Sequence, residues 1–290
     1  MAFFETLLNG LSIGSTYAMI ALGYTMVYGI AKMLNFAHGD VIMVGGYMIY
    51  LTMAGIGNPV LGLIFAAIAC VVLGVTIEKI AYKPLRGASP LAVLITAIGV
   101  SYLLQSTAQM IFGSAPKLVL VADLGNIELA GMKIPVYTLV TLGCSAVIMI
   151  VLSLFVKYTR IGRAMIAVSE DKGAAQLMGI NVNLIITITF AIGSALAAFA
   201  GFFMLMKSPS LSNTLGAMPG IKAFTAAVIG GIGSIPGAMA GGILIGVVEA
   251  TSLTIPAIAP YTDAVEFLIL IVILLARPTG LLGKKRREKV

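Results

Sequence analysis

The chain alternates between long apolar segments and short polar connections. A membrane-spanning helix needs about 20 predominantly apolar residues. The segments that meet this pattern are residues 6–31, 40–55, 61–80, 91–112, 136–156, 184–206 and 263–277. They are too long and too continuously apolar for the alternating strands of an outer-membrane barrel. The pattern therefore predicts an all-α, polytopic transmembrane bundle, with residues 1–290 forming a single domain.

The composition supports lipid as the solvent for much of the surface. Hydrophobic residues make up 60% of the chain and charged residues only 10%, whereas soluble domains carry about 25% charge. The net charge of +7 lies beside the predicted membrane ends. We interpret this charge as a topology signal and not as a nucleic-acid site.

A glycine-rich run at residues 223–254 could form one span or a broken pair. Glycine and proline free backbone groups that hydrocarbon cannot satisfy, so such a segment must be buried in protein or line a cavity. The alternative is that small residues let helices approach closely. We expect close packing for Gly241, Gly242 and Gly246, and about eight spans with glycine-broken or re-entrant segments in all. A broken segment is expected around Gly230, Gly231, Gly233, Pro236 and Gly237.

Basic residues predict the orientation. Three of them lie at residues 79–86, four at 157–172 and six in the tail at 277–290, which together are thirteen of the eighteen. Lysine and arginine are enriched in cytoplasmic loops. We therefore expect these three regions in the cytoplasm, and the N-terminus and the 113–135 loop outside.

Residues 157–183 form the longest polar interruption of the chain. Ser169 or Asp171 can cap a helix start, and Gly179 can supply the left-handed conformation that ends a helix. A helix of about nine residues is too short to be stable alone, so a partner or the membrane domain must hold it. We interpret this segment as a docking loop through which another protein moves this one; the alternative is an amphipathic connector lying on the membrane. Its outward face is expected to contain Ala174, Ala175, Leu177 and Met178.

Ionisable groups at membrane depth usually face a partner or a cavity. Asp40, with Asn35 and His38 nearby, and Glu249 are candidates for an internal polar pathway. The other acids lie near predicted helix ends. We expect Glu78 to be solvated, and Asp263 and Glu266 to favour the start of the last helix.

Motifs for catalysis are absent from the sequence. No phosphate-binding G-x-x-x-x-G-K-[ST] is present, so the chain is not expected to hydrolyse nucleotide. His38 is the only histidine, and Cys70 and Cys144 lie within apolar runs as packing residues. The sequence predicts no catalytic residue, no metal, no cofactor and no enzyme.

Five segments together resemble the branched-chain amino acid ABC importer permease family, specifically the shorter of its two permease types. They are GLSIGSTYAMIALGYTMVYGI, NFAHGD, TRIGRAMIAVSEDKGAAQLMGIN, VIGGIGSIPGAMAGGILIGVVE and ARPTGLLG. The polar loop resembles the EAA-type loop of bacterial ABC importer permeases, although its acid and alanines are not contiguous. The residues that carry this loop resemblance are Glu170, Ala174, Ala175 and Gly179. Together with Arg163 and Asp171, they are the residues we expect in an ATPase-coupling loop.

This resemblance implies a bacterial inner-membrane importer made of several subunits. The chain would pair with a second, homologous permease, two cytoplasmic ATPase subunits and a periplasmic substrate-binding protein. The implied substrates are leucine, isoleucine and valine, or related amino acids, amides or urea. The alternatives are a stand-alone secondary carrier or channel for small solutes, which lacks visible proton-relay carboxylates here, and a membrane enzyme, which lacks a nucleophile or metal cluster.

Overall fold

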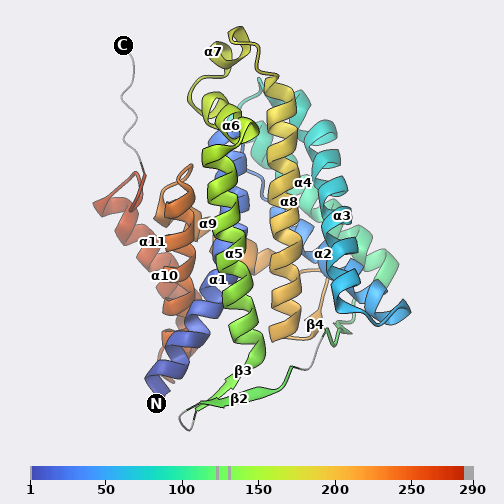
Figure 1. Cartoon of the computed structure of the whole chain (residues 1–290), viewed down its shortest axis with the longest axis vertical. Coiled ribbons are helices and arrows are strands. Elements are labelled where there is room, and N and C mark those ends of the chain that lie inside the picture. Colours follow the sequence, from blue (N-terminus) through green and yellow to red (C-terminus); the bar gives the residue numbers. More distant parts are fainter. Residues whose placement is uncertain (1, 122–123, 130–131, 284–290) are drawn as a thin grey trace.

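The computed structural model describes residues 2–121, 124–129 and 132–283. This part of the chain is mostly helical (Figure 1), which confirms the predicted fold class. Residues 284–290 of the predicted cytoplasmic tail lie outside the described residues. The main helices are α1 (Ala2–Ala31), α2 (His38–Gly55), α3 (Pro59–Ile77), α4 (Pro90–Phe112), α5 (Val136–Tyr158), α6 (Arg160–Glu170), α7 (Lys172–Leu177), α8 (Val182–Lys207), α9 (Ala217–Gly230), α10 (Ile235–Thr254) and α11 (Thr262–Ala276).

Seven of the described helices are long and apolar enough to cross a membrane. The seven are α1, α3 (continued as far as Leu85), α4, α5, α8, α10 and α11. The last of these spans includes the short 3₁₀ turn η3 (Ala259–Tyr261) that leads into α11. The predicted span at 40–55 corresponds to α2, which is not among them, and α9 has only 14 residues. The glycine-rich run is therefore a broken pair, α9 and α10.

The two ends of the molecule carry different structures. One end carries α6 and α7, and the other carries a β-hairpin of β2 (Asn126–Leu129) and β3 (Met132–Pro135) together with the start of α1 (Figure 1). A second antiparallel pair, β1 (Lys117–Leu118) with β4 (Ser210–Leu211), joins the segment after α4 to the segment after α8. Lys117 lies opposite Leu211 in this pair.

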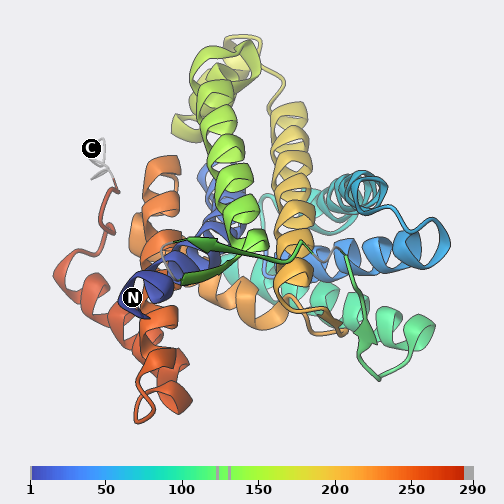
Figure 2. The same cartoon turned by 60° about the horizontal axis from the view of Figure 1, so that its bottom comes forward.

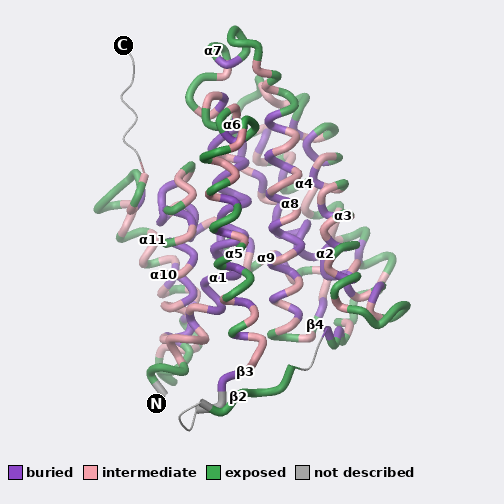
Figure 3. The backbone as a smooth tube through the Cα atoms, in the orientation of Figure 1, coloured by how far each residue is buried: buried purple, intermediate pink, exposed green. Residues whose placement is uncertain are grey.

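Helix α1 is the buried centre of the bundle (Figure 3), and it is the least apolar of the seven described helices that could cross a membrane. Small residues let α10 approach it closely. A methyl group on Gly246 would overlap the backbone of Gly14, and one on Gly242 would overlap Ala18. This is the close helix packing expected of small residues spaced along a membrane helix.

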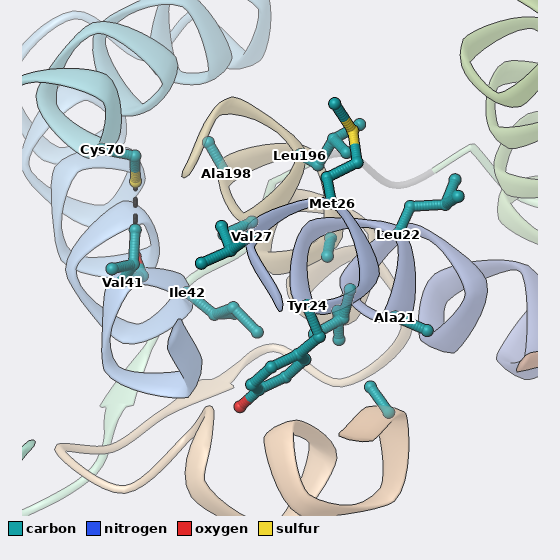
Figure 4. Close-up of a cluster of buried hydrophobic side chains, with 14 of the residues drawn as sticks. Ala21, Leu22, Tyr24, Met26, Val27, Val41, Ile42, Cys70, Leu196 and Ala198 are labelled. Atoms are coloured by element: carbon teal, nitrogen blue, oxygen red, sulfur yellow. Dashed lines mark hydrogen bonds between the residues drawn. The ribbon is translucent and has the colours of Figure 1, made fainter. Parts of the chain in front are cut away.

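The core lies where α1, α2 and α8 meet (Figure 4). Leu22, Val27, Ile42 and Leu196 are among its buried side chains. The thiol of Cys70 donates a hydrogen bond to the carbonyl of Val41 at 3.3 Å, which links α3 to α2. Cys70 is thus a packing residue as predicted, whereas Cys144 is exposed on α5.

The outer helices present apolar side chains to the surroundings. Ile64, Ile68 and Val72 on α3 are exposed, and so are Val147, Ile150 and Val151 on α5. Figure 3 shows exposed stretches of backbone on α3 and α5. Exposed apolar patches of this extent mark contact with a membrane or another protein. The chain is a multi-pass membrane protein.

Candidate functional site

The polar loop contains two helices, α6 and α7, and not the single helix predicted. The Thr159 hydroxyl caps α6 by accepting a hydrogen bond from the Gly162 amide at 3.0 Å. The Asp171 carboxylate caps α7 by accepting one from the Ala174 amide at 2.9 Å. Gly179 has a φ of +82°, in the left-handed region that favours glycine. The cap at Asp171 and the helix end at Gly179 therefore lie where the sequence suggested.

The membrane domain holds α7 in place. The Lys172 ammonium donates a hydrogen bond to the carbonyl of Ala31, the last residue of α1, at 2.8 Å. Burial lowers the pKa of Lys172, and the charge of Arg86 lowers this pKa further. Met165 and Val168 anchor α6 by burial in the core. The contact from Lys172 connects the loop to the central helix of the bundle.

The expected outward face of α7 is wrong in one respect. Ala175 is buried, with 4% of its surface exposed, whereas Leu177 is 90% and Met178 82% exposed. Two residues along an α-helix are about 200° apart, so Ala175 and Leu177 point in opposite directions. The exposed apolar surface at the end of α7 is the pair Leu177 and Met178, with the exposed Ala174 beside it. Arg163, Glu170, Asp171 and Gly179 are also exposed.

A second cluster joins one lysine to three acids. The ammonium of Lys222 in α9 lies 2.8 Å from Asp263, 3.2 Å from Glu249 and 3.2 Å from Glu266. The Tyr17 hydroxyl of α1 donates a hydrogen bond to Glu249 at 2.7 Å. The cluster therefore connects α1, α9, α10 and α11.

This cluster corrects the expectation for Glu266. Glu266 was expected to stabilise the start of the last helix. It is instead fully buried, with an exposed fraction of 0%, and it pairs with Lys222. Asp263 is half-exposed and does lie in the first turn of α11. Sequence reasoning missed Lys222. A lysine within an apolar, glycine-containing segment requires an acidic partner at membrane depth, and that signal could have found it.

A pocket of about 190 Å³ adjoins this cluster. Its walls come from α1, α5, α8, α9 and α10 and from the loop residues after α8 and before α9. The wall includes both charged and apolar side chains. These side chains include Ile13, Tyr17, Phe203, Lys207, Leu215 and Glu249.

The other predicted polar residues lie in or just before the first turn of α2 and are buried. Asn35 accepts a hydrogen bond from the Tyr82 hydroxyl at 2.9 Å, and Asp40 accepts one from the Gln105 amide at 2.8 Å. The His38 ring lies edge-on to Tyr24, with ring centroids 4.8 Å apart. These contacts join α2 to neighbouring elements. They do not join the three residues to Glu249, which belongs to the Lys222 cluster.

The expectation that Glu78 is solvated is also wrong. Its exposed fraction is 0%, because the chain continues from α3 into a π-helical turn, η1 (Glu78–Tyr82), and not into solvent. Arg86, just after the 3₁₀ turn η2 (Lys83–Leu85), pairs with its carboxylate. The Thr187 hydroxyl of α8 donates a hydrogen bond to it at 2.8 Å. These contacts hold the basic 79–86 segment beside the start of α8, at the α6–α7 end of the molecule.

The broken segment is only partly buried: Gly230, Gly231 and Gly237 are buried, whereas Gly233 and Pro236 are exposed. Gly231 and Gly233 have φ of +105° and +93°. The Ser234 hydroxyl caps α10, with Pro236 in the first turn, and Gly230 meets Gly237 so closely that neither could carry a methyl group. The amides of Leu281 and Leu282 donate hydrogen bonds to the last carbonyls of α9, at 2.8 and 3.0 Å.

Helices α2 and α9 begin beside each other inside the bundle. A methyl group on Gly39 would overlap the backbone of Gly216, and Gly220 also contacts Gly39. Both helices lie across the longer ones in Figure 2. The chain is thus a multi-pass membrane protein whose interior contains short helices, the Lys222 cluster and the buried polar residues around the start of α2. Transporters use this architecture of broken helices in the membrane interior.

Comparison with known proteins places the chain in a family. The family model described as branched-chain amino acid transport system / permease component matches residues 6–274. The chain belongs to this family, as its resemblance predicted.

Relatives cover nearly the whole chain. The high-affinity branched-chain amino acid transport system permease protein BraD of Pseudomonas aeruginosa is 43% identical over 99% of this chain and 98% of its own length. The corresponding LivH protein of Escherichia coli is 42% identical with the same coverage. The ribose import permease protein RbsC of Haemophilus influenzae is 26% identical over 97% of this chain and 87% of its own length. These relatives are permease proteins of transport systems and not enzymes.

Proposed function

We propose that the chain is the permease subunit of an ABC importer that moves branched-chain amino acids into the cytoplasm. Full-length similarity to permeases of high-affinity branched-chain amino acid systems supports the substrate class. The proposed partners are a second homologous permease, two cytoplasmic ATPase subunits and a periplasmic substrate-binding protein. The sequence has no phosphate-binding motif, so partner subunits must supply ATP hydrolysis.

One observation carries the coupling part of this proposal. Leu177 and Met178 form an exposed apolar tip on α7, while Ala175 and Lys172 hold the same helix against the membrane domain. An exposed apolar pair on a fixed support suits a groove in another protein better than it suits water. Movement of the partner could then reach α1 through the contact between Lys172 and Ala31. An amphipathic connector lying on the membrane would not require this support.

The pathway is proposed to involve Glu249 more directly than Asp40. Glu249 borders a pocket, whereas Asn35, His38 and Asp40 make contacts between elements around α2. The broken segment from Gly230 to Gly237 gives α9 and α10 a place to bend relative to each other. These assignments give the polar residues different tasks, either in the pathway or in holding the helices.

The test is transport by the assembled complex. We expect proteoliposomes that contain this chain and its partner subunits to take up labelled leucine only with ATP and the binding protein. Uptake of labelled urea and of labelled short amides is measured in parallel, as the alternative substrates. Leucine or urea uptake by this chain alone, without ATP, would instead support a stand-alone carrier or channel.

A further inference from the structure

The pocket beside the Lys222 cluster lies toward the end of the molecule that carries the β2–β3 hairpin. Its walls include Lys207, in the last turn of α8, and Thr141, near the start of α5. Helix α5 begins directly after β3, and α8 leads into β4. At about 190 Å³, the pocket is smaller than the roughly 300–1,000 Å³ of sites for drug-sized ligands. It suits a single small solute.

Opposite charges lie in this wall. Oε2 of Glu249 accepts hydrogen bonds from Tyr17 at 2.7 Å and from Lys222 at 3.2 Å. Within the described residues, Oε1 of Glu249 has no hydrogen-bond partner, and Lys207 has neither a hydrogen bond nor an ion pair. The Glu249 carboxylate is thus oriented by two donors, while one of its oxygens remains able to accept a hydrogen bond.

The remaining wall is largely apolar. Ile13, Phe203 and Leu215 contribute aliphatic and aromatic surface. A ligand that matches the pocket needs one positive group, one negative group and an apolar body. An α-amino acid with an aliphatic side chain has all three, and charge-assisted hydrogen bonds are the stronger kind.

We propose that this pocket is a binding site for the zwitterion of an aliphatic α-amino acid. Lys207 binds its carboxylate, Oε1 of Glu249 accepts a hydrogen bond from its ammonium, and Ile13, Phe203 and Leu215 contact its side chain. The inference rests on the proposed function and assigns the substrate to a site on this chain. The permease then selects for both charges of the amino acid, so urea and simple amides are poor ligands of the pocket.

The test measures binding to the permease directly. Equilibrium binding of labelled leucine is measured on the purified permease–ATPase complex without the substrate-binding protein. The competitors are unlabelled leucine, 4-methylpentanoate, which lacks the ammonium, and 3-methylbutylamine, which lacks the carboxylate. We expect each of the two analogues to compete at least about tenfold more weakly than leucine, because each loses a charge-assisted hydrogen bond.

Variants identify the pocket. Lys207→Met should weaken leucine binding by at least about tenfold and leave competition by 3-methylbutylamine unchanged. Lys207→Arg keeps the charge and should retain more binding. Lys117→Met, a loss of the same charge on the nearby strand β1, is the control and should bind leucine normally. Glu249→Gln should also weaken leucine binding; if that variant fails to fold, the Lys207 variants still decide.

Two results would overturn the inference. One is unchanged leucine affinity in Lys207→Met. The other is the absence of saturable leucine binding in a wild-type complex that does transport leucine with its binding protein. If the complete complex transports no branched-chain amino acid, the proposed function itself is wrong, so the two failures are distinguishable.

Discussion

Lys222 shows how a single residue can organise several membrane helices. Its ammonium lies within 3.2 Å of Glu249 and Glu266 and within 2.8 Å of Asp263. Removal of one partner from a buried ion pair costs about 3–5 kcal/mol, because the remaining charge is uncompensated. Glu266 is fully buried and would be the group most affected by the loss of Lys222.

Lys222→Met should therefore lower the thermal stability of the purified permease or reduce the amount of folded protein. We expect a destabilisation of about 3–5 kcal/mol. The double variant Lys222→Met with Glu266→Gln should recover part of this loss, because it removes the stranded charge. The measurement is the fraction of permease that remains folded after heating to a series of temperatures, determined by size-exclusion chromatography. A single variant as stable as the wild type would show that the cluster does not hold the helices together.

At the scale of elements, α1 and α10 pack through small residues. Gly10 and Gly14 of α1 face Gly246 of α10, and Gly242 faces Ala18. Contacts at this distance leave no room for a methyl group. The bundle therefore depends on glycine here for close approach and not for backbone flexibility.

Gly246→Ala should destabilise the bundle, since the added methyl group must push α1 and α10 apart. Overpacking of this kind costs about 1–3 kcal/mol. Gly99→Ala is the matched control, because Gly99 lies in α4 with open space around it. Alanine is about 1 kcal/mol more favourable than glycine in a helix, so the control should be neutral or slightly stabilised. Equal thermal stability of the two variants would contradict the packing described here.

The elements also show what sequence reasoning could find. Continuous apolar runs identified the long helices, and the polar interruption at 157–183 located α6 and α7 with the Asp171 cap and the Gly179 end. The Lys222 cluster was missed because its members come from four helices that only tertiary packing brings together. The inward position of Ala175 was missed for the same reason: a short helix has two faces, and the sequence does not say which one the membrane domain covers.

At the scale of the whole molecule, two basic regions lie at one end. Arg86 pairs with Glu78 and also contacts Asn183, and Lys172 contacts the end of α1. The 79–86 segment and the α6–α7 loop are therefore neighbours, with the β2–β3 hairpin at the opposite end (Figure 1). The basic bias predicts that the α6–α7 end is cytoplasmic.

Labelling of single cysteines tests this orientation. In a background without Cys70 and Cys144, Ile127→Cys on the hairpin should react with a membrane-impermeant thiol reagent in intact cells. Glu170→Cys at the end of α6 should react only after the membrane is opened. Both positions are exposed in the structure, so access depends on the side of the membrane. The reverse labelling pattern would invert the proposed topology.

In the proposed mechanism, partner ATPases drive this permease through α7. Ala175→Arg is a poor test, because Ala175 is buried within the chain and the variant would disturb α7 itself. Leu177→Asp is sharper: it places a charge on the exposed apolar tip, which should prevent burial against a partner. Leu118→Asp makes the same change at an exposed leucine on β1 and serves as the control.

The decisive measurement is co-purification of the ATPase subunits with each variant, followed by ATP-driven leucine uptake by the same preparations. We expect Leu177→Asp to reach the membrane at the normal level but to lose the ATPase subunits and take up no leucine. Leu118→Asp should keep both ATPase subunits. If Leu177→Asp retains its ATPase partners and transports leucine at the wild-type rate, α7 is not the coupling element.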